Sequence, residues 1–313
     1  MKRRKAIKKG LMGSAALSAL ASIPANAFRT SRFSTEKMWK INVFSKHLQW
    51  VDYDEMAKIT AEIGFSGVDL TVRPKGHVEP ENVERDLPKV AEACDKHGIE
   101  MGMMTTAIQS ASDPTTEPIL KTAASLGVKV YRLGWYKYDF NKSIQDNLKK
   151  FRIELKKICE LNAKYGIVGD YQNHAGISAG SAVWDIHELI NDLDTKWLGV
   201  QYDIRHAMVE GLKSWPLGLR LLAPRIHSID IKDFEYQKTE QGWDVKNVPL
   251  GKGAVDFNSY FDLLNELNVH APISIHFEYP LGGADHGERE LTIPGEQVIE
   301  AMAKDLSYLR TVL

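Results

Sequence analysis

A repeated unit, in which a helical pattern ends at a glycine and a short apolar strand follows, is the strongest constraint on the fold of this 313-residue chain. Glycine just past a helix takes up the left-handed conformation that ends it. The unit occurs in AEIGFSGVDLTV, CDKHGIEMGMM, AASLGVKVYRLG and LNAKYGIVGDYQNH. Further strand candidates are KINVFS, WLGVQYD, RIHSIDIKD and PISIHFEYP, which brings the predicted strands to eight.

The alternation of strands and helices predicts an α/β fold. Helical patterns separate the strands, for example over 143–165 and in the final segment 295–313. Eight such units in a chain near the usual ~250 residues predict a single-domain (β/α)8 TIM barrel. A doubly wound open sheet is the alternative, but no G-x-G-x-x-G motif follows the first strand.

The first 27 residues have the pattern of a secretory signal peptide. A basic start, MKRRKAIKKG, precedes a short apolar run over 11–23 and the small-residue sequence ANA at 25–27. Arg3 and Arg4 resemble a twin-arginine signal. We therefore expect a signal peptide at 1–27, a linker at 28–38 and the barrel at 39–313. This interpretation predicts a periplasmic or secreted protein with no membrane span after cleavage.

Charge and cysteine content exclude some partners. Taking the six basic residues of 1–27 from the total of 40 leaves 34 basic against 41 acidic side chains, a net charge of −7. A nucleic-acid partner is not expected, because phosphate binding needs a basic surface. Cys94 and Cys159 lie in no metal-binding or redox spacing, and the sequence leaves open whether they pair and whether the chain forms oligomers.

Polar side chains alternate with apolar ones along several predicted strands. In a barrel, alternate side chains point outward to the helices and inward to the axis. Along ISIHFEYP, Ile273, Ile275 and Phe277 are predicted to face outward, whereas His276 and Glu278 face inward. An antiparallel sheet with one solvated face shows the same alternation, but the intervening helices argue against it. Inward polar positions elsewhere are Asp69, Thr71, Arg73, Asp170, Gln172, His174, Gln201, Asp203, Ser228, Asp230 and Lys232.

These inward groups gather at the carboxyl ends of the strands, where barrel enzymes build their active sites. A single carboxylate there often caps a helix or pairs with a cation. Lys232 is placed to neutralise Asp230 or Asp233, and His227, at an outward position, is interpreted as a packed histidine. Four strands ending in convergent ionisable groups nevertheless predict a functional site.

Several strand-end motifs carry a resemblance to a known family. The motifs YQNHAG, VQYDIRHAMVEG, DIKDF, PLGKGAVDF and HFEY, in this order, resemble the sugar phosphate isomerase/epimerase superfamily of xylose-isomerase-like barrels. The stretch GVDLTVRPKGHVEPENV, together with the export signal, is similar to a secreted branch of carbohydrate-degrading bacteria. The resemblance covers essentially all of the chain after the signal.

The resemblance implies one divalent metal ion, held by a Glu, an Asp, a His and a Glu on strands five to eight. Asp203 and Glu278 match this pattern by position, whereas Gln172 replaces the first Glu and Asp230 replaces the His. Such ligands favour manganese, magnesium or cobalt over a structural zinc. The predicted metal ligands are Gln172, Asp203, Asp230 and Glu278, with His174, His206 and His276 nearby.

Gln172 changes the chemistry that the resemblance implies. Family epimerases use two glutamates as acid and base, and a glutamine side chain cannot take up a proton. We therefore expect an isomerase/epimerase-like enzyme that abstracts one proton next to a carbonyl. Alternatives are a keto-glycoside lyase working by β-elimination and a non-catalytic carbohydrate-binding barrel. The predicted catalytic residues are Glu278 or His276 as base, His174 or His206 as acid, and Lys232.

Export argues for an unphosphorylated sugar or keto-glycoside as substrate, because phosphorylated sugars are mainly intracellular. Trp135 or Trp243 could stack on a sugar ring, although Trp135 could equally pack under a loop. The predicted substrate-binding residues, which lie near the strand ends, are Lys46, His47, Asp69, Arg73, His77, Arg132 and Trp135.

Overall fold

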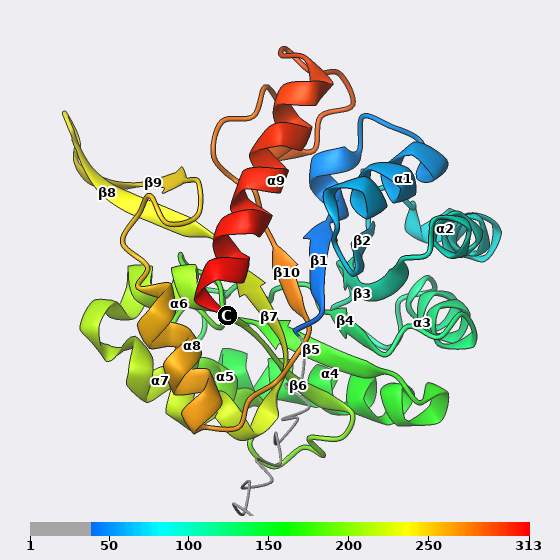
Figure 1. Ribbon diagram of the computed structural model, residues 1–313. Coiled ribbons are helices and arrows are strands. Elements are labelled where there is room, and N and C mark those ends of the chain that lie inside the picture. Colours follow the sequence, from blue (N-terminus) through cyan, green and yellow to red (C-terminus); the bar gives the residue numbers. More distant parts are fainter. Residues whose placement is uncertain (1–38) are drawn as a thin grey trace, which may run out of the picture. The chain divides into compact units, whose positions relative to one another are not determined.

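Eight parallel strands close into a barrel in the computed structural model, which describes residues 39–313 (Figure 1). All eight predicted stretches supply a strand, so the (β/α)8 prediction is confirmed. The predicted signal peptide (1–27) and linker (28–38) lie outside the described residues. In order around the barrel the strands are β1 (Ile41–Phe44), β2 (Gly67–Val72), β3 (Glu100–Thr106), β4 (Val130–Arg132), β5 (Val168–Gln172), β6 (Leu198–Asp203), β7 (Ile226–Ile231) and β10 (Ile273–Ile275).

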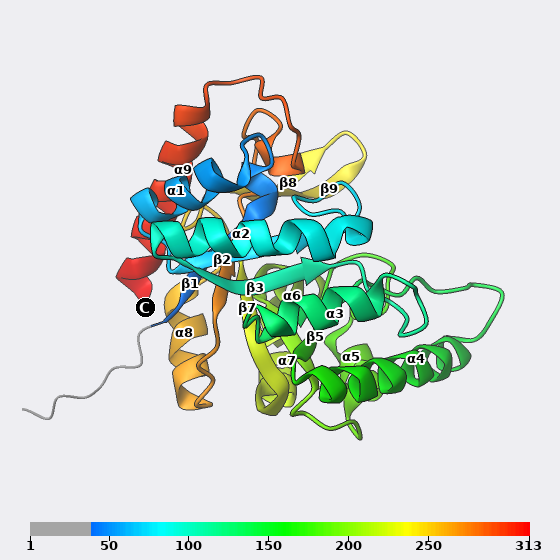
Figure 2. The ribbon, with the colours of Figure 1, turned by 90° about the vertical axis from the view of Figure 1, so that its right-hand side faces the viewer.

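Helices surround the barrel, as the two ribbon views show (Figures 1 and 2). Gly64 and Gly166 end two of them in the left-handed conformation, with φ of 97° and 69°. The Ser143 side chain caps the start of the helix that Gly166 ends. The helices are α1 (Tyr53–Ile63), α2 (Val83–His97), α3 (Thr116–Ser125), α4 (Ile144–Tyr165), α5 (Val183–Ile190), α6 (Ile204–Gly211), α7 (Trp215–Leu222), α8 (Phe257–Glu266) and α9 (Gly295–Val312), with short 3-10 turns η1 (Ser45–Leu48), η2 (Pro80–Asn82), η3 (Leu212–Ser214), η4 (Ala223–Arg225) and η5 (Ala284–His286).

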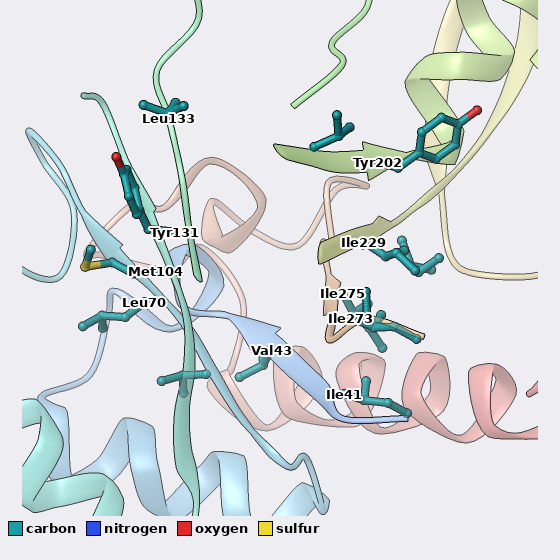
Figure 3. Packing of buried hydrophobic residues seen from close by; sticks show 14 of the residues in the cluster. Ile41, Val43, Leu70, Met104, Tyr131, Leu133, Tyr202, Ile229, Ile273 and Ile275 are labelled. Carbon is teal, nitrogen blue, oxygen red and sulfur yellow. The ribbon is translucent and has the colours of Figure 1, made fainter. Parts of the chain in front are cut away.

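The apolar core lies between the strands and the helices. Figure 3 shows Ile273 and Ile275 of β10 beside Ile41 and Val43 of β1 among the buried apolar side chains. The strands are bonded in register, with Ile41 opposite Ile273 and Val43 opposite Ile275. The residues that alternate with these apolar ones along each strand point to the other side of the sheet, so the polar side chains fill the barrel interior.

A two-stranded antiparallel hairpin interrupts the regular pattern after β7. Its strands are β8 (Asp233–Thr239) and β9 (Gly242–Val248), and they project beyond the barrel (Figures 1 and 2). This hairpin was not predicted from the sequence. Trp243, one of the two tryptophans considered for stacking on a sugar ring, lies on β9 and is 73% exposed.

His227 corrects one prediction about side-chain direction. Between β6 and β7, Val200 pairs with Ile226 and Gln201 with Ser228, so His227 is an extra residue that breaks the alternation. Its Nδ1 lies 3.0 Å from an Asp170 carboxylate oxygen. Burial alone would lower the pKa of His227, but the hydrogen bond and charge of Asp170 outweigh it and raise this pKa.

Cys94 in α2 and Cys159 in α4 are buried free thiols, which answers the question of their pairing. Among the residues of 39–313, no helix is both long enough and apolar enough to cross a membrane.

The outward position of Ile275 can be tested by substitution. Ile275→Asp places a carboxylate where the side chain is fully buried, and we expect it to lower the free energy of unfolding by roughly 3–5 kcal/mol. Ile153→Asp on α4, where the side chain is 58% exposed, is the matched control and should cost less than about 0.5 kcal/mol. Denaturant unfolding of both proteins gives the comparison, and equal stabilities would contradict the assigned orientation.

Candidate active site

The inward polar residues meet at the carboxyl ends of the strands, as predicted from the alternation. Almost all of them are shielded from solvent, so their charges interact strongly with one another. The predicted site residues that the structure brings into one connected cluster are Lys46, Asp69, Arg132, Gln172, Asp203, His206, Asp230, Lys232, His276 and Glu278.

Lys232 lies at the centre of this cluster, just after β7. Its ammonium nitrogen is 3.1 Å from Asp203 Oδ2 and 3.5 Å from Glu278 Oε2. Burial alone would lower the pKa of Lys232, but the charges of the two carboxylates raise it, so the ammonium form is favoured. Lys232 therefore contacts Asp203 and Glu278 directly, while Asp230, one of its two predicted partners, acts on it only through longer-range charge. Asp233, the other predicted partner, binds backbone N–H groups instead.

Asp233 has a separate, structural role. Its carboxylate accepts hydrogen bonds from the backbone N–H groups of Phe234, Gly251, Gly253 and Val255. These bonds tie the chain that follows the hairpin to the end of β7.

Gln172 holds three of its neighbours together. Its Oε1 accepts a hydrogen bond of 2.8 Å from the Arg132 guanidinium. Its Nε2 donates to Asp203 Oδ2 at 3.0 Å and also to Asp230 Oδ2. The amide oxygen that was predicted to bind a metal ion is therefore already used by a cation of the protein.

Glu278 is the carboxylate of the cluster that remains open to a ligand. Its side chain is 24% exposed, whereas that of Asp203 is fully buried. Lys46 on η1 contacts its other oxygen at 3.2 Å. Burial would raise the pKa of Glu278, but Lys232, His276 and Lys46 hold it well below the usual value, so the group is ionised.

A pocket of about 830 Å³ adjoins this end of the barrel. Lys46 and Arg73, both predicted to bind substrate, lie in its wall together with Arg289. Another pocket, of about 760 Å³, opens at the opposite end of the strands and is lined by His227 and Trp39, among others. It contains none of the predicted substrate-binding residues, whereas the first pocket contains two of them, and one of these, Lys46, contacts Glu278. We therefore place the candidate site beside the first pocket.

Two neutral imidazoles lie beside the cluster. The rings of His174 and His206 are 3.9 Å apart, and Trp135 lies 4.4 Å from His174. Burial lowers the pKa of His174 to about 4 and that of His206 well below its usual value. His174 Nδ1 donates to the Ala175 carbonyl oxygen, which can only accept, so its Nε2 carries a free lone pair.

Two of the predicted substrate-binding histidines are held by the backbone instead. His47 Nδ1 is bonded to the Ala284 carbonyl oxygen and its Nε2 accepts from the Phe277 N–H, so no ring nitrogen is left for a sugar hydroxyl. His77 Nε2 donates to the Leu48 carbonyl oxygen. Both rings are buried and pack the loops that surround the site.

Trp135 also has protein partners. The Arg132 guanidinium lies 4.4 Å from its ring centre, which is a cation–π contact. The His174 ring is also 4.4 Å from it, so Trp135 packs against residues of the site, and stacking on a sugar ring stays a prediction.

Several residues that were not predicted from the sequence position the cluster. Asn173 exchanges two hydrogen bonds of 2.8 Å with the backbone of Asp203. Arg205 donates to His206 Nδ1 and to Asn247 of β9, and Asn247 in turn donates to the Glu278 carbonyl oxygen. The unpredicted hairpin thus supports the site. The only sequence signal was the position of Asn173 and Arg205 within the quoted strand-end motifs.

Taken together, the four residues predicted to bind a metal ion are not arranged to bind one. Gln172 Oε1 faces Arg132, and Asp203 and Glu278 face Lys232. Within the described part of the chain, a different group could hold an ion. It consists of Asp69, Asp230 and His276, each of which offers one ligand atom within 4.8 Å of the others.

The central position of Lys232 leads to a test of stability. Lys232→Met leaves Asp203 without its cation in a buried setting, and we expect a loss of about 3–5 kcal/mol in the free energy of unfolding. Adding Asp203→Asn should recover part of that loss, because it removes the unpaired charge. Lys238→Met on the exposed hairpin is the control, with an effect below about 0.5 kcal/mol. Additive losses in the double variant would contradict the pairing.

Comparison with known proteins agrees with this architecture. Structures that resemble the chain include 3-keto-D-glucoside 4-epimerase from E. coli (TM-score 0.64, 18% identity, 88% of this chain and 100% of that one) and D-allulose 3-epimerase from Methylomonas sp. with D-allulose bound (TM-score 0.63, 14% identity, 88% and 97%). Identities this low establish the fold alone.

A relative by sequence is the putative L-ribulose-5-phosphate 3-epimerase of Haemophilus influenzae, which is 25% identical over 181 residues. The match covers 56% of this chain and 60% of that protein. The sequence profile described as "Xylose isomerase-like TIM barrel" matches residues 57–310, most of the chain. The chain therefore belongs to the xylose isomerase-like TIM barrel family, as the strand-end motifs predicted.

Proposed function

We propose that the protein is a sugar isomerase/epimerase-like enzyme that removes a proton next to a carbonyl group of a carbohydrate. The observation that carries the proposal is the setting of Glu278. It is an ionised carboxylate that a ligand can reach, and it lies between the ammonium groups of Lys46 and Lys232. A base beside two cations suits a reaction in which a proton leaves carbon while negative charge develops on a nearby oxygen.

Glu278 accepts the proton in the proposed reaction. As the proton leaves, the carbonyl oxygen of the sugar becomes an enediolate oxygen, and Lys232 and Lys46 stabilise its charge. His276 was the other candidate base, but its side chain is almost completely buried. Burial would lower the pKa of His276, yet Asp230 raises it, so this imidazole is not a free base.

His174 is the proposed second proton carrier. Its neutral imidazole has a free Nε2 and lies at the rim of the cluster. His206 is less suited, because it is buried and its Nδ1 accepts from Arg205. Gln172 cannot exchange protons, so the two-glutamate reaction implied by the family resemblance does not apply here. No step of the proposed reaction depends on a metal ion.

The proposed substrate is an unphosphorylated sugar or a keto-glycoside. The signal-like residues 1–27 support export, and export to the periplasm favours unphosphorylated sugars. The similar fold of a 3-keto-D-glucoside 4-epimerase makes keto-glycosides a natural choice for testing. β-Elimination from a keto-glycoside begins with the same proton removal, so a lyase is the second candidate.

Proton exchange in D2O tests the proposal. We expect the protein to introduce deuterium next to the carbonyl of free ketoses or 3-keto-glycosides, which NMR would detect together with any isomerised or eliminated product. Glu278→Gln should slow the exchange by about 10³-fold or more, because the base is lost. Glu296→Gln, exposed on α9, is the matched control. Sugar binding without any exchange would favour the non-catalytic barrel.

The pH dependence gives an independent test of the assigned groups. Glu278 has a depressed pKa and the pKa of His174 is about 4, so both are unprotonated at neutral pH. The pKa of Lys232 is raised, so it stays charged in the same range. We expect a flat exchange rate from about pH 5.5 to 8, and a fall at higher pH as Lys46, whose pKa is lowered by burial, loses its proton. An inflection near the ordinary histidine value of about 6.5 would contradict the assignment.

A further inference from the structure

The four carboxylates of the cluster are not neutralised in the same way. Asp203 and Glu278 share the Lys232 ammonium, and Glu278 also has Lys46. Asp69 and Asp230 are fully buried, and in the described part of the chain no lysine or arginine nitrogen lies within 4.0 Å of either one. Arg132 and Lys232 act on this pair only through longer-range charge. Two buried carboxylates this close to each other favour a bound proton or a further cation between them.

Among the residues of 39–313, His276 is the ionisable side chain with a nitrogen within 4.0 Å of both carboxylates. Its Nε2 lies 3.3 Å from Asp230 Oδ1 and 4.0 Å from Asp69 Oδ2. None of these contacts satisfies the geometry of a hydrogen bond, since Asp230 Oδ1 and both ring nitrogens of His276 are buried without a partner. Unpaired polar atoms that face one another across a buried space are able to bind an ion or a water molecule.

The surrounding residues fix these three side chains in place. Phe44 stacks on the His276 ring at 4.1 Å between centres. The Thr105 and Ser274 hydroxyls donate to the Asp69 carboxylate, and Gln172 donates to the second oxygen of Asp230. Outer hydrogen bonds of this kind orient the residues that bind a metal ion and leave their remaining lone pairs directed at it.

We propose that Asp69, Asp230 and His276 bind one divalent transition-metal ion inside the barrel, next to the Lys232 ion-pair network. Two carboxylate oxygens and one imidazole nitrogen suit manganese, iron, cobalt or zinc. The site shares only Asp230 with the set predicted from the family resemblance. It uses β2, β7 and the end of β10, whereas the predicted set lies on β5, β6, β7 and the end of β10.

The proposed ion has a positioning role and goes beyond the proposed function. Asp230 and Lys232 lie two residues apart on one strand end, and His276 and Glu278 lie two residues apart on the next. An ion that binds Asp230 and His276 therefore holds together the two backbone segments that carry Lys232 and Glu278. It supplies the charge that two buried carboxylates lack.

Metal analysis of the full-length chain, purified without chelator and loaded with manganese, tests the proposal. We expect about one ion per chain in the wild type, in Glu278→Gln and in Asp203→Asn. His276→Gln and Asp69→Asn should each retain at least tenfold less. Circular dichroism checks that each variant folds. Loss of the ion from Glu278→Gln and Asp203→Asn, with retention in His276→Gln, would place it at the set first predicted and overturn the proposal.

Pulsed electron paramagnetic resonance of the manganese-loaded wild type gives an answer that does not depend on any variant. The proposed site contains an imidazole ligand, whereas the predicted set of Gln172, Asp203, Asp230 and Glu278 contains none. We expect coupling to one imidazole nitrogen. Bound manganese without that coupling, or no bound ion at all, would overturn the proposal. The deuterium exchange assigned to Glu278 is measured separately, so failure here leaves the proposed function standing.

Discussion

Charge neutralisation inside the barrel is the constraint on which the site depends. Asp69, Asp203, Asp230 and Glu278 are brought together in a space from which water is largely excluded, where unpaired charges are costly. Lys232 bridges two of the four strands concerned and so fixes the positions of Asp203 and Glu278 relative to each other. The same contact keeps Glu278 ionised, which is the property a base requires. Stability and the proposed reactivity therefore depend on one ion-pair network.

The fold keeps this network of charged side chains apart from the apolar core. Along β10 the isoleucines at 273 and 275 pack towards the helices, so Ser274, His276 and Glu278 are free to be polar. The hairpin formed by β8 and β9 adds support from outside, since Asn247 bonds both Arg205 and the backbone of Glu278. A loop insertion that interrupts the barrel pattern thus contributes to the geometry of the site.

The barrel could be predicted from the sequence because its signals are local. A glycine after a helix, such as Gly64, and alternating apolar residues, as in β10, depend only on nearby residues. The predictions were wrong where the contacts of a side chain depend on segments that are distant in the sequence. His47 is held by the Ala284 carbonyl oxygen and the Phe277 N–H, more than 200 positions away. His227 departs from its predicted direction because one extra residue in β7 breaks the register with β6.

The two departures from the family pattern, Gln172 and Asp230, are best understood as one coupled change. The Gln172 amide donates to both Asp203 and Asp230, whereas a glutamate there would add a third negative charge beside those two carboxylates. A histidine at 230 would remove one of the two buried carboxylates, so Asp69 would not face a second negative charge. Each replacement therefore favours the other. Together they allow Lys232 to neutralise one pair of carboxylates and leave the second pair, Asp69 and Asp230, facing His276.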